Sequence, residues 1–400
     1  MAKSKKVKII ISKKTKKRSS STYKYYAEAE FIPETYLQQQ FKSRGNWTRI
    51  TRDKLKTTPD LDYIYVDGKC LLDKIHYGVK TKLKNIISGK GDIISDKAKF
   101  IRQMALHPKS KGFVQETVNI DMLDIANNPK LLADKYNKLF ANPVPRDWDS
   151  SPVSTVYIFK PISGYGGAGI QRFNSFEAFS KYCQKIISSW TSKWQDIKNP
   201  HRDFYRHWQL QQYITNPLLI RMKPDNRLYK FHIRMFYIYR PGDKKSFYLK
   251  RGLMATALKP YFNGNWHDKK IHDTHFYGRI GESFPGALKL SQVKLDDIYR
   301  QLDVVFSEID KILKKARVGC FPESNNCFHL FGADIMLTRD YKVKILEVNG
   351  SPGLFYNDSP ILPAELKSVV ENIMDQVVDD YFPPKHKPAN PYAEDVIYLD

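Results

Sequence analysis

The chain has 400 residues, which is too long for one compact module and suits two or three lobes of the usual ~100–200 residues. Hydrophobic residues make up 42% of it and aromatic residues 13%, a balance that excludes a disordered or collagen-like protein. A net charge of +24 predicts an acidic partner: nucleic acid, an anionic membrane, nucleotide phosphates or an acidic polypeptide.

Residues 1–24 are predicted to be a disordered basic tail, because they carry ten Lys and Arg residues and no acid. Removing those ten charges from +24 leaves +14, so the rest of the chain is basic as well. Such a run is most often a solvated or nuclear-targeting segment, and less often a docking arm for an anionic partner. It is not a signal peptide, because the apolar run Val7–Ile11 is short and interrupted by Lys8.

Other features of the composition bear on location. No apolar stretch approaches the ~18–20 residues of a membrane span, so we expect a soluble protein with no membrane partner. Cys70, Cys183, Cys320 and Cys327 are too few and too scattered for a disulfide framework, and no Cys-x-x-Cys pair suggests zinc. We therefore expect a reduced, cytoplasmic or nuclear compartment.

Residue patterns along the chain predict a mixed α/β fold. Residues 25–95 are expected to form a small N-terminal lobe, 96–212 a central lobe and 213–400 a C-terminal lobe, with a Pro-marked linker at Asn142–Pro152. The predicted helices are Asp96–Leu106, a segment with Phe176, Phe179, Ile186 and Ile187 on one face, Gln292–Ala316 and Ala364–Tyr381; the predicted strands are Val153–Lys160, Trp208–Ile214, Lys230–Arg240, Ser246–Leu253, Cys327–Leu337 and Val343–Val348.

A glycine-rich loop follows the strand that ends at Lys160. Its residues include Ser163, Gly164, Gly166, Gly167 and Gly169. Glycines let backbone N–H groups converge on phosphate oxygens, and the lysine supplies positive charge. The loop matches neither the Walker nor the Rossmann pattern, and a plain flexible turn explains it about equally well.

Two carboxylates are predicted to face each other across a β-hairpin. If Asp340-Tyr341 is a two-residue turn, Asp334 lies opposite Glu347, and Asn349 shares their sheet face. Like charges directly opposite are destabilising unless a hard cation lies between them, and Mg²⁺ takes oxygen ligands of these kinds. The alternative is two solvated acids on an exposed sheet face, and a one-residue slip of the register would separate the pair.

Cationic side chains line a neighbouring strand. Lys230, His232 and Arg234 alternate and so point to one face, and Lys250 and Arg251 follow on the next strand. Arginine suits a bidentate grip on phosphate or carboxylate, although a basic edge strand would look the same. Together with the loop and the hairpin, these residues predict a nucleotide–Mg²⁺ site between two sheets, and hence ATP chemistry.

Ordered motifs over roughly residues 25–400 resemble the tubulin tyrosine ligase family of ATP-grasp ligases. They are Gly45-Asn46-Trp47-x-Arg49, His76, Asp96-Lys97-x-Lys99-Phe100, the Lys160–Ile170 loop, Gln211-Gln212-Tyr213-Ile214-x-x-Pro217-Leu218-Leu219, Lys230-Phe-His-Ile-Arg234, Tyr248-Leu-Lys-Arg251, Leu330-Phe-Gly-Ala-Asp334, Leu346-Glu347-Val-Asn349-Gly-Ser351-Pro352 and the closing Phe382-Pro383. The resemblance implies an ATP-grasp fold, α/β (α+β) in class, with two sheet-containing lobes clasping ATP after a small N-terminal mixed α/β lobe.

The resemblance also implies an activity: ATP-dependent addition of an amino acid to a protein carboxylate, such as an acidic tubulin tail, through an acyl phosphate. It assigns ATP contacts to Lys97, Lys160, Ser163, Gly164, Gly166, Gly167, Gln211, Gln212, Tyr213, Ile214 and Lys230, a γ-phosphate or acyl-phosphate grip to Arg234 and Arg251, and Mg²⁺ to Asp334, Glu347 and Asn349. We expect a cytoplasmic monomer with access to the cytoskeleton, and nucleic acid is a minor alternative among its partners.

The sequence departs from the family pattern around the pockets. His232 stands where the family usually has Asp, Gly166 where it has Lys or Arg, Gln212 where Lys is common, and His275 where Asn is expected. These changes leave ATP binding as the expectation and leave the added amino acid open between Tyr, Glu and Gly. They also keep two alternatives: a catalytically weakened relative that binds microtubules or another polyanion, and, on charge alone, a nucleic-acid-binding protein.

Overall fold

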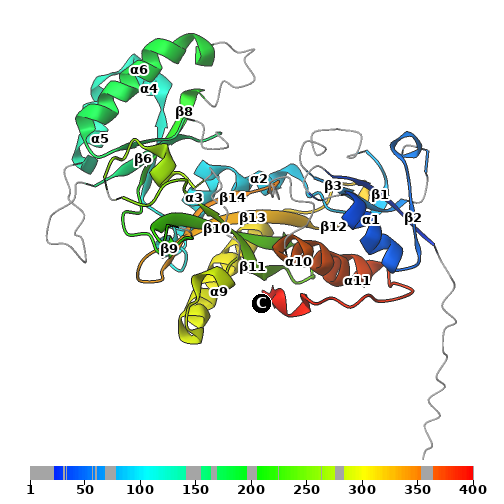
Figure 1. Cartoon of the computed structure of the whole chain (residues 1–400). Helices are drawn as coiled ribbons and strands as arrows, with labels where there is room; N and C mark the ends of the chain where they lie inside the picture. Colours follow the sequence, from blue (N-terminus) through cyan, green and yellow to red (C-terminus); the bar gives the residue numbers. More distant parts are fainter. Residues whose placement is uncertain are drawn as a thin grey trace, which may run out of the picture.

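Three β-sheets, each packed against helices, organise the chain (Figure 1). The computed structural model describes residues 22–29, 32, 34–55, 57–58, 61–67, 78–140, 155–163, 169–195, 205–223, 225–262, 264–274, 283–352 and 364–399. Residues 1–21 of the predicted tail, His76, three glycines of the loop (164, 166 and 167) and His275 lie outside these ranges. Within them, no helix combines the length and the apolar character needed to cross a membrane.

The first sheet is parallel and belongs mainly to the N-terminal part of the chain. Its strands, in spatial order, are β12 (Ser324–Cys327), β4 (Thr81–Lys84), β3 (Leu61–Val66), β1 (Tyr23–Glu28) and β2 (Trp47–Arg49). Helix α1 (Glu34–Ser43) buries Leu37 and Phe41 against it, and the ring of Phe41 stacks on Tyr25 with centroids 3.7 Å apart. Strand β12 comes from far along the chain, so this sheet ties the N-terminal part to the C-terminal part.

The second sheet is antiparallel and has four strands. Their order is β5 (Thr117–Asp121), β8 (His207–Gln212), β6 (Tyr157–Pro161) and β7 (Gln171–Phe173), and the helices beside it are α4 (Met122–Asn127), α5 (Lys130–Phe140) and α6 (Phe176–Gln195). Aromatic side chains fill its core, with Phe159 stacked on Trp208 at 4.6 Å. Figure 1 shows this sheet and its helices as a lobe set apart from the other two sheets.

The third sheet is the largest and carries most of the candidate site. Its antiparallel strands are β14 (Val343–Asn349), β13 (His329–Leu337), β10 (Leu228–Tyr239), β11 (Phe247–Thr256) and β15 (Val396–Tyr398), with β9 (Leu219–Arg221) paired to β10. Helix α9 (Gln292–Lys315) covers one face and confirms the helix predicted over Gln292–Ala316; it packs its buried Ile298, Leu302, Phe306, Ile309 and Leu313 against the sheet.

Helix α10 (Ala364–Ile373) covers the opposite face of the same sheet, together with residues of α1. It continues through a π-helical turn at Met374–Val378 into α11 (Asp379–Tyr381), so the helix predicted over Ala364–Tyr381 is confirmed. Two short helices and one longer one complete the architecture: α2 (Asp92–Ser95), α8 (Lys269–His272) and α3 (Lys97–Leu106). Helix α3 confirms the helix predicted over Asp96–Leu106, with Asp96 as its N-cap.

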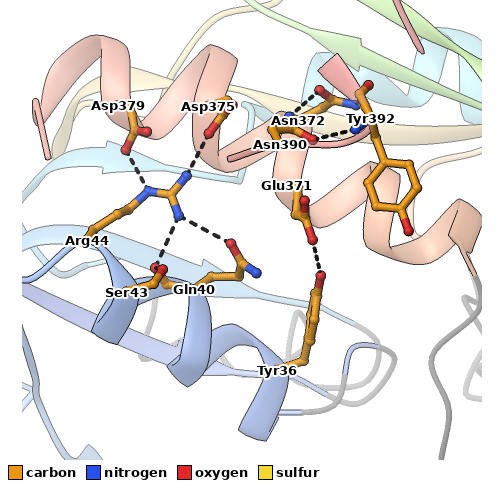
Figure 2. Close-up of polar contacts among 10 residues, drawn as sticks. All are labelled: Tyr36, Gln40, Ser43, Arg44, Glu371, Asn372, Asp375, Asp379, Asn390 and Tyr392. Carbon is orange, nitrogen blue, oxygen red and sulfur yellow. Dashed lines mark hydrogen bonds and ion pairs between the residues drawn. The ribbon is translucent and has the colours of Figure 1, made fainter. Parts of the chain in front are cut away.

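A buried arginine joins α1 to the π-helical turn and α11. Arg44 is 1% exposed; its Nε donates to Asp379 and its Nη2 to Asp375, each at 2.8 Å, and its Nη1 donates to Gln40 O at 3.1 Å (Figure 2). A second contact in the same interface links Tyr36 Oη to Glu371 at 2.5 Å. Because buried charges of this kind are costly unless they are paired, these contacts attach the end of α1 to the π-helical turn and α11.

The hairpin between β13 and β14 has a different turn from the one predicted. Leu337 pairs with Val343 and Thr338 N–H donates to Lys342 O, so the loop has three residues and ends at Tyr341, whose φ is 61°. The two-residue turn is therefore wrong. The predicted pairing of Asp334 with Glu347 is nevertheless confirmed, because a β-bulge at Leu346 shifts the register back by one residue.

The cysteines also differ from expectation. Cys320 and Cys327 form a disulfide across the segment that joins α9 to β12, while Cys183 is free and buried. The two cysteines are only seven positions apart. The turn that enters β12 brings the two residues together, with a Cα–Cα distance of 5.4 Å.

Candidate functional site

A cleft is lined by residues of both antiparallel sheets. Strands β6 and β8 contribute one wall, and β10, β13 and β14 contribute the other. The predicted site residues that line it are Lys97, Lys160, Gln211, Gln212, Tyr213, Ile214, Lys230, Asp334 and Glu347. The structure thus brings together residues that are up to 250 positions apart in the sequence.

Other predicted residues lie elsewhere. Ser163 is exposed and does not line the cleft. Arg234 and Asn349 do not line the cleft, but each of them contacts a carboxylate that does. Arg251 does not line it either, because its Nε pairs with Asp395 Oδ2 at 2.7 Å. The structure therefore places Arg251 outside the cleft, whereas the resemblance implied that it grips a phosphate there.

The paired carboxylates are surrounded by donors. Arg234 holds Asp334 with a two-pronged contact, Nε to Oδ1 and Nη2 to Oδ2, both at 2.7 Å. Asn349 Nδ2 lies 3.4 Å from Asp334 Oδ2 and 3.3 Å from Glu347 Oε1, and Lys97 Nζ lies 3.4 Å from Glu347 Oε2. These cations and the amide offset the repulsion that two opposed acids would otherwise cause.

Lys160 projects from the end of β6 into the cleft. Its Nζ donates to Gln211 Oε1 at 3.0 Å, and Gln211 Nε2 in turn donates to Thr117 Oγ1 at 3.0 Å. Burial lowers the pKa of Lys160 to about 8; the charge of Glu347 acts in the opposite direction, and Lys97 lowers it further. The lysine therefore titrates close to physiological pH, where a bound anion would favour its charged form.

Lys230 begins a buried chain of polar contacts. Its Nζ donates to Tyr213 Oη at 2.5 Å and to His272 O at 3.2 Å, and it lies 4.1 Å from the centre of the Tyr213 ring. His272 Nε2 faces Gly264 O at 3.0 Å and so carries the proton, which leaves Nδ1 to accept from Tyr213 Oη at 3.1 Å. Burial, aided by nearby charges, lowers the pKa of Lys230 well below its usual value and that of His272 to about 4.

Two further cleft residues were not assigned a role from the sequence. Arg172 of β7 is 3% exposed, and its Nε has no hydrogen-bond partner among the described residues. Its guanidinium lies 5.7 Å from the ring centre of Tyr213, and its charge helps to lower the pKa of Lys230. The second is Thr274, whose Oγ1 lies 2.7 Å from His232 Nδ1. The one sequence signal for Arg172 is its place in a short strand directly after the glycine loop.

The arrangement suits a nucleotide. Burial and neighbouring cations lower the pKa of Lys160 and of Lys230, so an anionic ligand would be favoured beside them. The apolar side chains in the same cleft favour a flat ring; the apolar lining includes Ile158, Pro161, Ile170, Ile214, Met336 and Leu346. The carboxylates of Asp334 and Glu347 also fit Mg²⁺, which is commonly held by one or two carboxylates together with substrate phosphates. Asn349 presents its amide nitrogen to both carboxylates, so its side-chain amide would have to turn over to offer its oxygen to the metal.

Comparisons with known proteins agree with this geometry. The model of the tubulin-tyrosine ligase family matches residues 93–277 and 286–390. Tubulin polyglutamylase ttll-4 of Caenorhabditis briggsae is 32% identical over 36% of this chain and 27% of its own length. Tubulin polyglutamylase TTLL11 of Mus musculus is 22% identical over 82% of this chain and 49% of its own length. The chain spans about half the length or less of these curated relatives.

A solved structure shares the fold. The C-terminal domain of K. lactis Pby1, an ATP-grasp enzyme that interacts with the mRNA decapping enzyme Dcp2, aligns with a TM-score of 0.58 at 19% identity, covering 94% of this chain and 98% of that one. The predicted ATP-grasp fold is therefore confirmed.

Proposed function

Because the chain belongs to the tubulin-tyrosine ligase family, we propose that it is an ATP-dependent ligase that joins an amino acid to a carboxylate of an acidic protein tail. The observation that carries the proposal is the meeting of Lys97, Lys160, Lys230 and the Asp334–Glu347 pair in one cleft. Lys97 lies on α3 and Lys160 on β6 of the second sheet, whereas the other three residues lie on strands of the third sheet. No single sheet therefore builds this site.

The proposed reaction has two steps. A carboxylate oxygen of the acceptor attacks the γ-phosphorus of ATP, the bond from that phosphorus to the β-phosphate oxygen breaks, and ADP leaves an acyl phosphate behind. The amine of the incoming amino acid then attacks the acyl carbon, loses its proton, and displaces inorganic phosphate. Each cycle converts one ATP to ADP and phosphate and forms one amide bond.

The chain's own residues supply position and charge for these steps. Lys97, Lys160 and Arg172 would hold the phosphates, and the apolar wall with Tyr213 and Ile214 would hold the base. Asp334, Glu347 and Asn349 would hold Mg²⁺, which when bound neutralises negative charge on the phosphates. Arg234 holds both oxygens of Asp334, so a metal ion at this site would share that carboxylate with the guanidinium.

We propose a tubulin tail or a similar acidic polypeptide as the acceptor. The matched relatives are named as tubulin ligases and polyglutamylases. The net charge of +14 outside the tail would also attract a polyanionic acceptor protein. A microtubule- or polyanion-binding protein without turnover is the second candidate, because both oxygens of Asp334 are already engaged by Arg234.

The test is a screen of the twenty labelled amino acids against tubulin and a set of acidic peptides, with ATP and Mg²⁺. The proposal predicts incorporation of at least one amino acid that stops when ATP is left out. Absence of incorporation into any acceptor, with or without ATP binding, would favour the second candidate.

A further inference from the structure

A disulfide fastens β12 to the chain segment around the end of β4. Cys327, the last residue of β12, pairs with Lys84 in the parallel register, and Cys320 forms a β-bridge with Ile87. The two cysteines are bonded to each other, so the disulfide holds together the two ends of a loop that contacts one short segment, residues 84–87. Both of these contacts therefore depend on the same covalent bond.

Strand β12 is short and polar. It is a four-residue edge strand of the first sheet with the sequence Ser-Asn-Asn-Cys, and Asn325 is exposed. Polar residues of these types have low β propensity, and such a strand buries little apolar surface. Because a cross-link limits the conformations open to the loop it closes, we expect the disulfide to hold β12 against β4. Without the bond, this pairing should open more readily.

The segment beside the disulfide leads directly to the candidate site. Ser88 N–H donates to Gly319 O, next to Cys320, at 2.8 Å. A single turn at residues 89–91 and the short helix α2 follow, and then Lys97 begins α3 with its Nζ 3.4 Å from Glu347 Oε2. The attachment of Ser88 to the loop therefore helps to set the position of Lys97 in the cleft.

The other end of the loop leads to the paired carboxylates. Strand β13 begins at His329, two residues after Cys327, and carries Asp334 further along. One ring nitrogen of His329 faces Asn85 O, just after β4, at 3.3 Å, and the other faces Gly350 O, just after β14, at 2.5 Å. His329 thus contacts the first sheet and both strands of the hairpin that holds Asp334. The disulfide lies beside this junction.

The bond is open to thiol exchange at one of its two cysteines. Cys320 is half-buried, whereas Cys327 is 4% exposed. A small thiol such as glutathione would reach Cys320 first, and exchange would proceed through a mixed disulfide on that residue. Disulfides that form in a reduced compartment, which the composition predicts for this chain, are usually transient and redox-sensing. Both considerations favour a reversible bond over a permanent one.

We propose that Cys320 and Cys327 form a thiol–disulfide switch that regulates nucleotide binding in the neighbouring cleft. In the oxidised state the bond holds β12 on β4 and keeps Lys97 and the hairpin of Asp334 in place. In the reduced state these segments are looser, and a smaller fraction of molecules is competent to bind. The apparent affinity falls with that fraction, so reduction should weaken ATP binding about three- to tenfold. Regulation of the cleft rests on the proposed function, whereas the change in structure does not.

Glutathione disulfide is the oxidant of this switch, and glutathione is its reductant. The thiolate of Cys320 attacks one sulfur of glutathione disulfide, the S–S bond breaks, and one glutathione thiolate leaves. The thiolate of Cys327 then attacks the sulfur of Cys320, the mixed disulfide breaks, and the second glutathione thiolate leaves. The two protein thiols give up two protons and two electrons, and glutathione disulfide takes them up to become two glutathione molecules.

The test equilibrates the full-length protein in glutathione buffers from oxidising to reducing and measures two quantities. Trapping of free thiols followed by peptide mass analysis gives the fraction of the Cys320–Cys327 disulfide, and calorimetry gives the dissociation constant of ATP with Mg²⁺. The affinity should decline in step with the loss of the bond. The double variant Cys320→Ser and Cys327→Ser should bind like reduced wild type at every ratio. Cys183→Ala, the matched control, removes a buried free thiol and should respond as wild type does.

Hydrogen exchange is a second measurement that needs no nucleotide. Reduction should speed amide exchange in residues 81–91 and 324–329 and leave the second sheet unchanged. Cys320→Ser alone, at the more exposed position, serves if the double variant does not fold. Equal affinity in the oxidised and reduced protein, or exchange that does not change in those residues, would overturn the inference. Absence of ATP binding in both states, together with the exchange response, would instead refute the proposed function and leave the thiol switch standing.

Discussion

The pH dependence of ATP binding is the most specific expectation from the cleft. Burial lowers the pKa of Lys160 to about 8, so the charged lysine that would contact phosphate is lost as the pH rises through that value. About nine tenths of the lysine is protonated at pH 7 and about one tenth at pH 9, so the affinity for ATP should fall about tenfold between these values. A bound phosphate raises the pKa of Lys160, so the decline continues above pH 8.

The assay is the dissociation constant of ATP, measured by calorimetry in half-unit steps from pH 7 to pH 9. Lys160→Met is the reference variant, since it keeps a similar length and has no charge to lose. It should bind at pH 7 about as weakly as wild type binds at pH 9, and its affinity should change little with pH. A wild-type affinity that stays flat, or a decline that is equally steep in Lys160→Met, would refute the assignment of Lys160 to the phosphates.

Three more outcomes follow from the structure. Arg44→Met should lower the free energy of unfolding by about 3–5 kcal/mol, because it leaves two buried carboxylates unpaired, whereas Lys181→Ala, which breaks the exposed pair with Glu177, should leave it nearly unchanged; equal shifts of the denaturant midpoint would contradict this. Arg172→Gln should weaken ATP binding without lowering the melting temperature, since its Nε has no partner among the described residues, and a lower melting temperature with intact binding would show a structural role instead. Deletion of residues 1–24 should weaken association with an acidic peptide, with a reduced salt dependence, and should leave ATP affinity as it is; loss of ATP affinity would contradict the position of the site.

Sequence patterns predicted the elements of the fold well where their period is strong. The helix over Gln292–Ala316 was found at Gln292–Lys315, and the strand over Lys230–Arg240 at Leu228–Tyr239. The assignment of β12 to the first sheet could not be predicted, because four polar residues, Ser-Asn-Asn-Cys, carry no alternation. That pairing depends on contacts distant in sequence, which a local pattern does not record.

The carboxylate pair shows how a correct site can follow from an incorrect local prediction. The two-residue turn was wrong by one residue, and the bulge at Leu346 was not expected. The longer loop shifts the pairing by one residue, and the bulge shifts it back by one residue, so Asp334 still lies opposite Glu347. Leu346 also lines the cleft, so the bulge lies at the site.

The position of Arg251 could not be read from the sequence either. The family resemblance assigned it a phosphate contact together with Arg234, whereas its side chain lies outside the cleft and pairs with Asp395, 144 positions further along the chain. The polar contacts around Asp395, which link α10 to the final segment, have no local signature in the sequence. Pairings of this kind become visible only when the tertiary structure is known.

The central claim, that this cleft uses ATP to form an amide bond, is tested most directly by counting products. In reactions with wild type, ATP, Mg²⁺ and an acceptor from the screen, the account predicts one ADP and one phosphate for each amino acid incorporated. Glu347→Gln should fold normally and form none of the three. ADP release without incorporation, or incorporation that continues in Glu347→Gln, would contradict the claim.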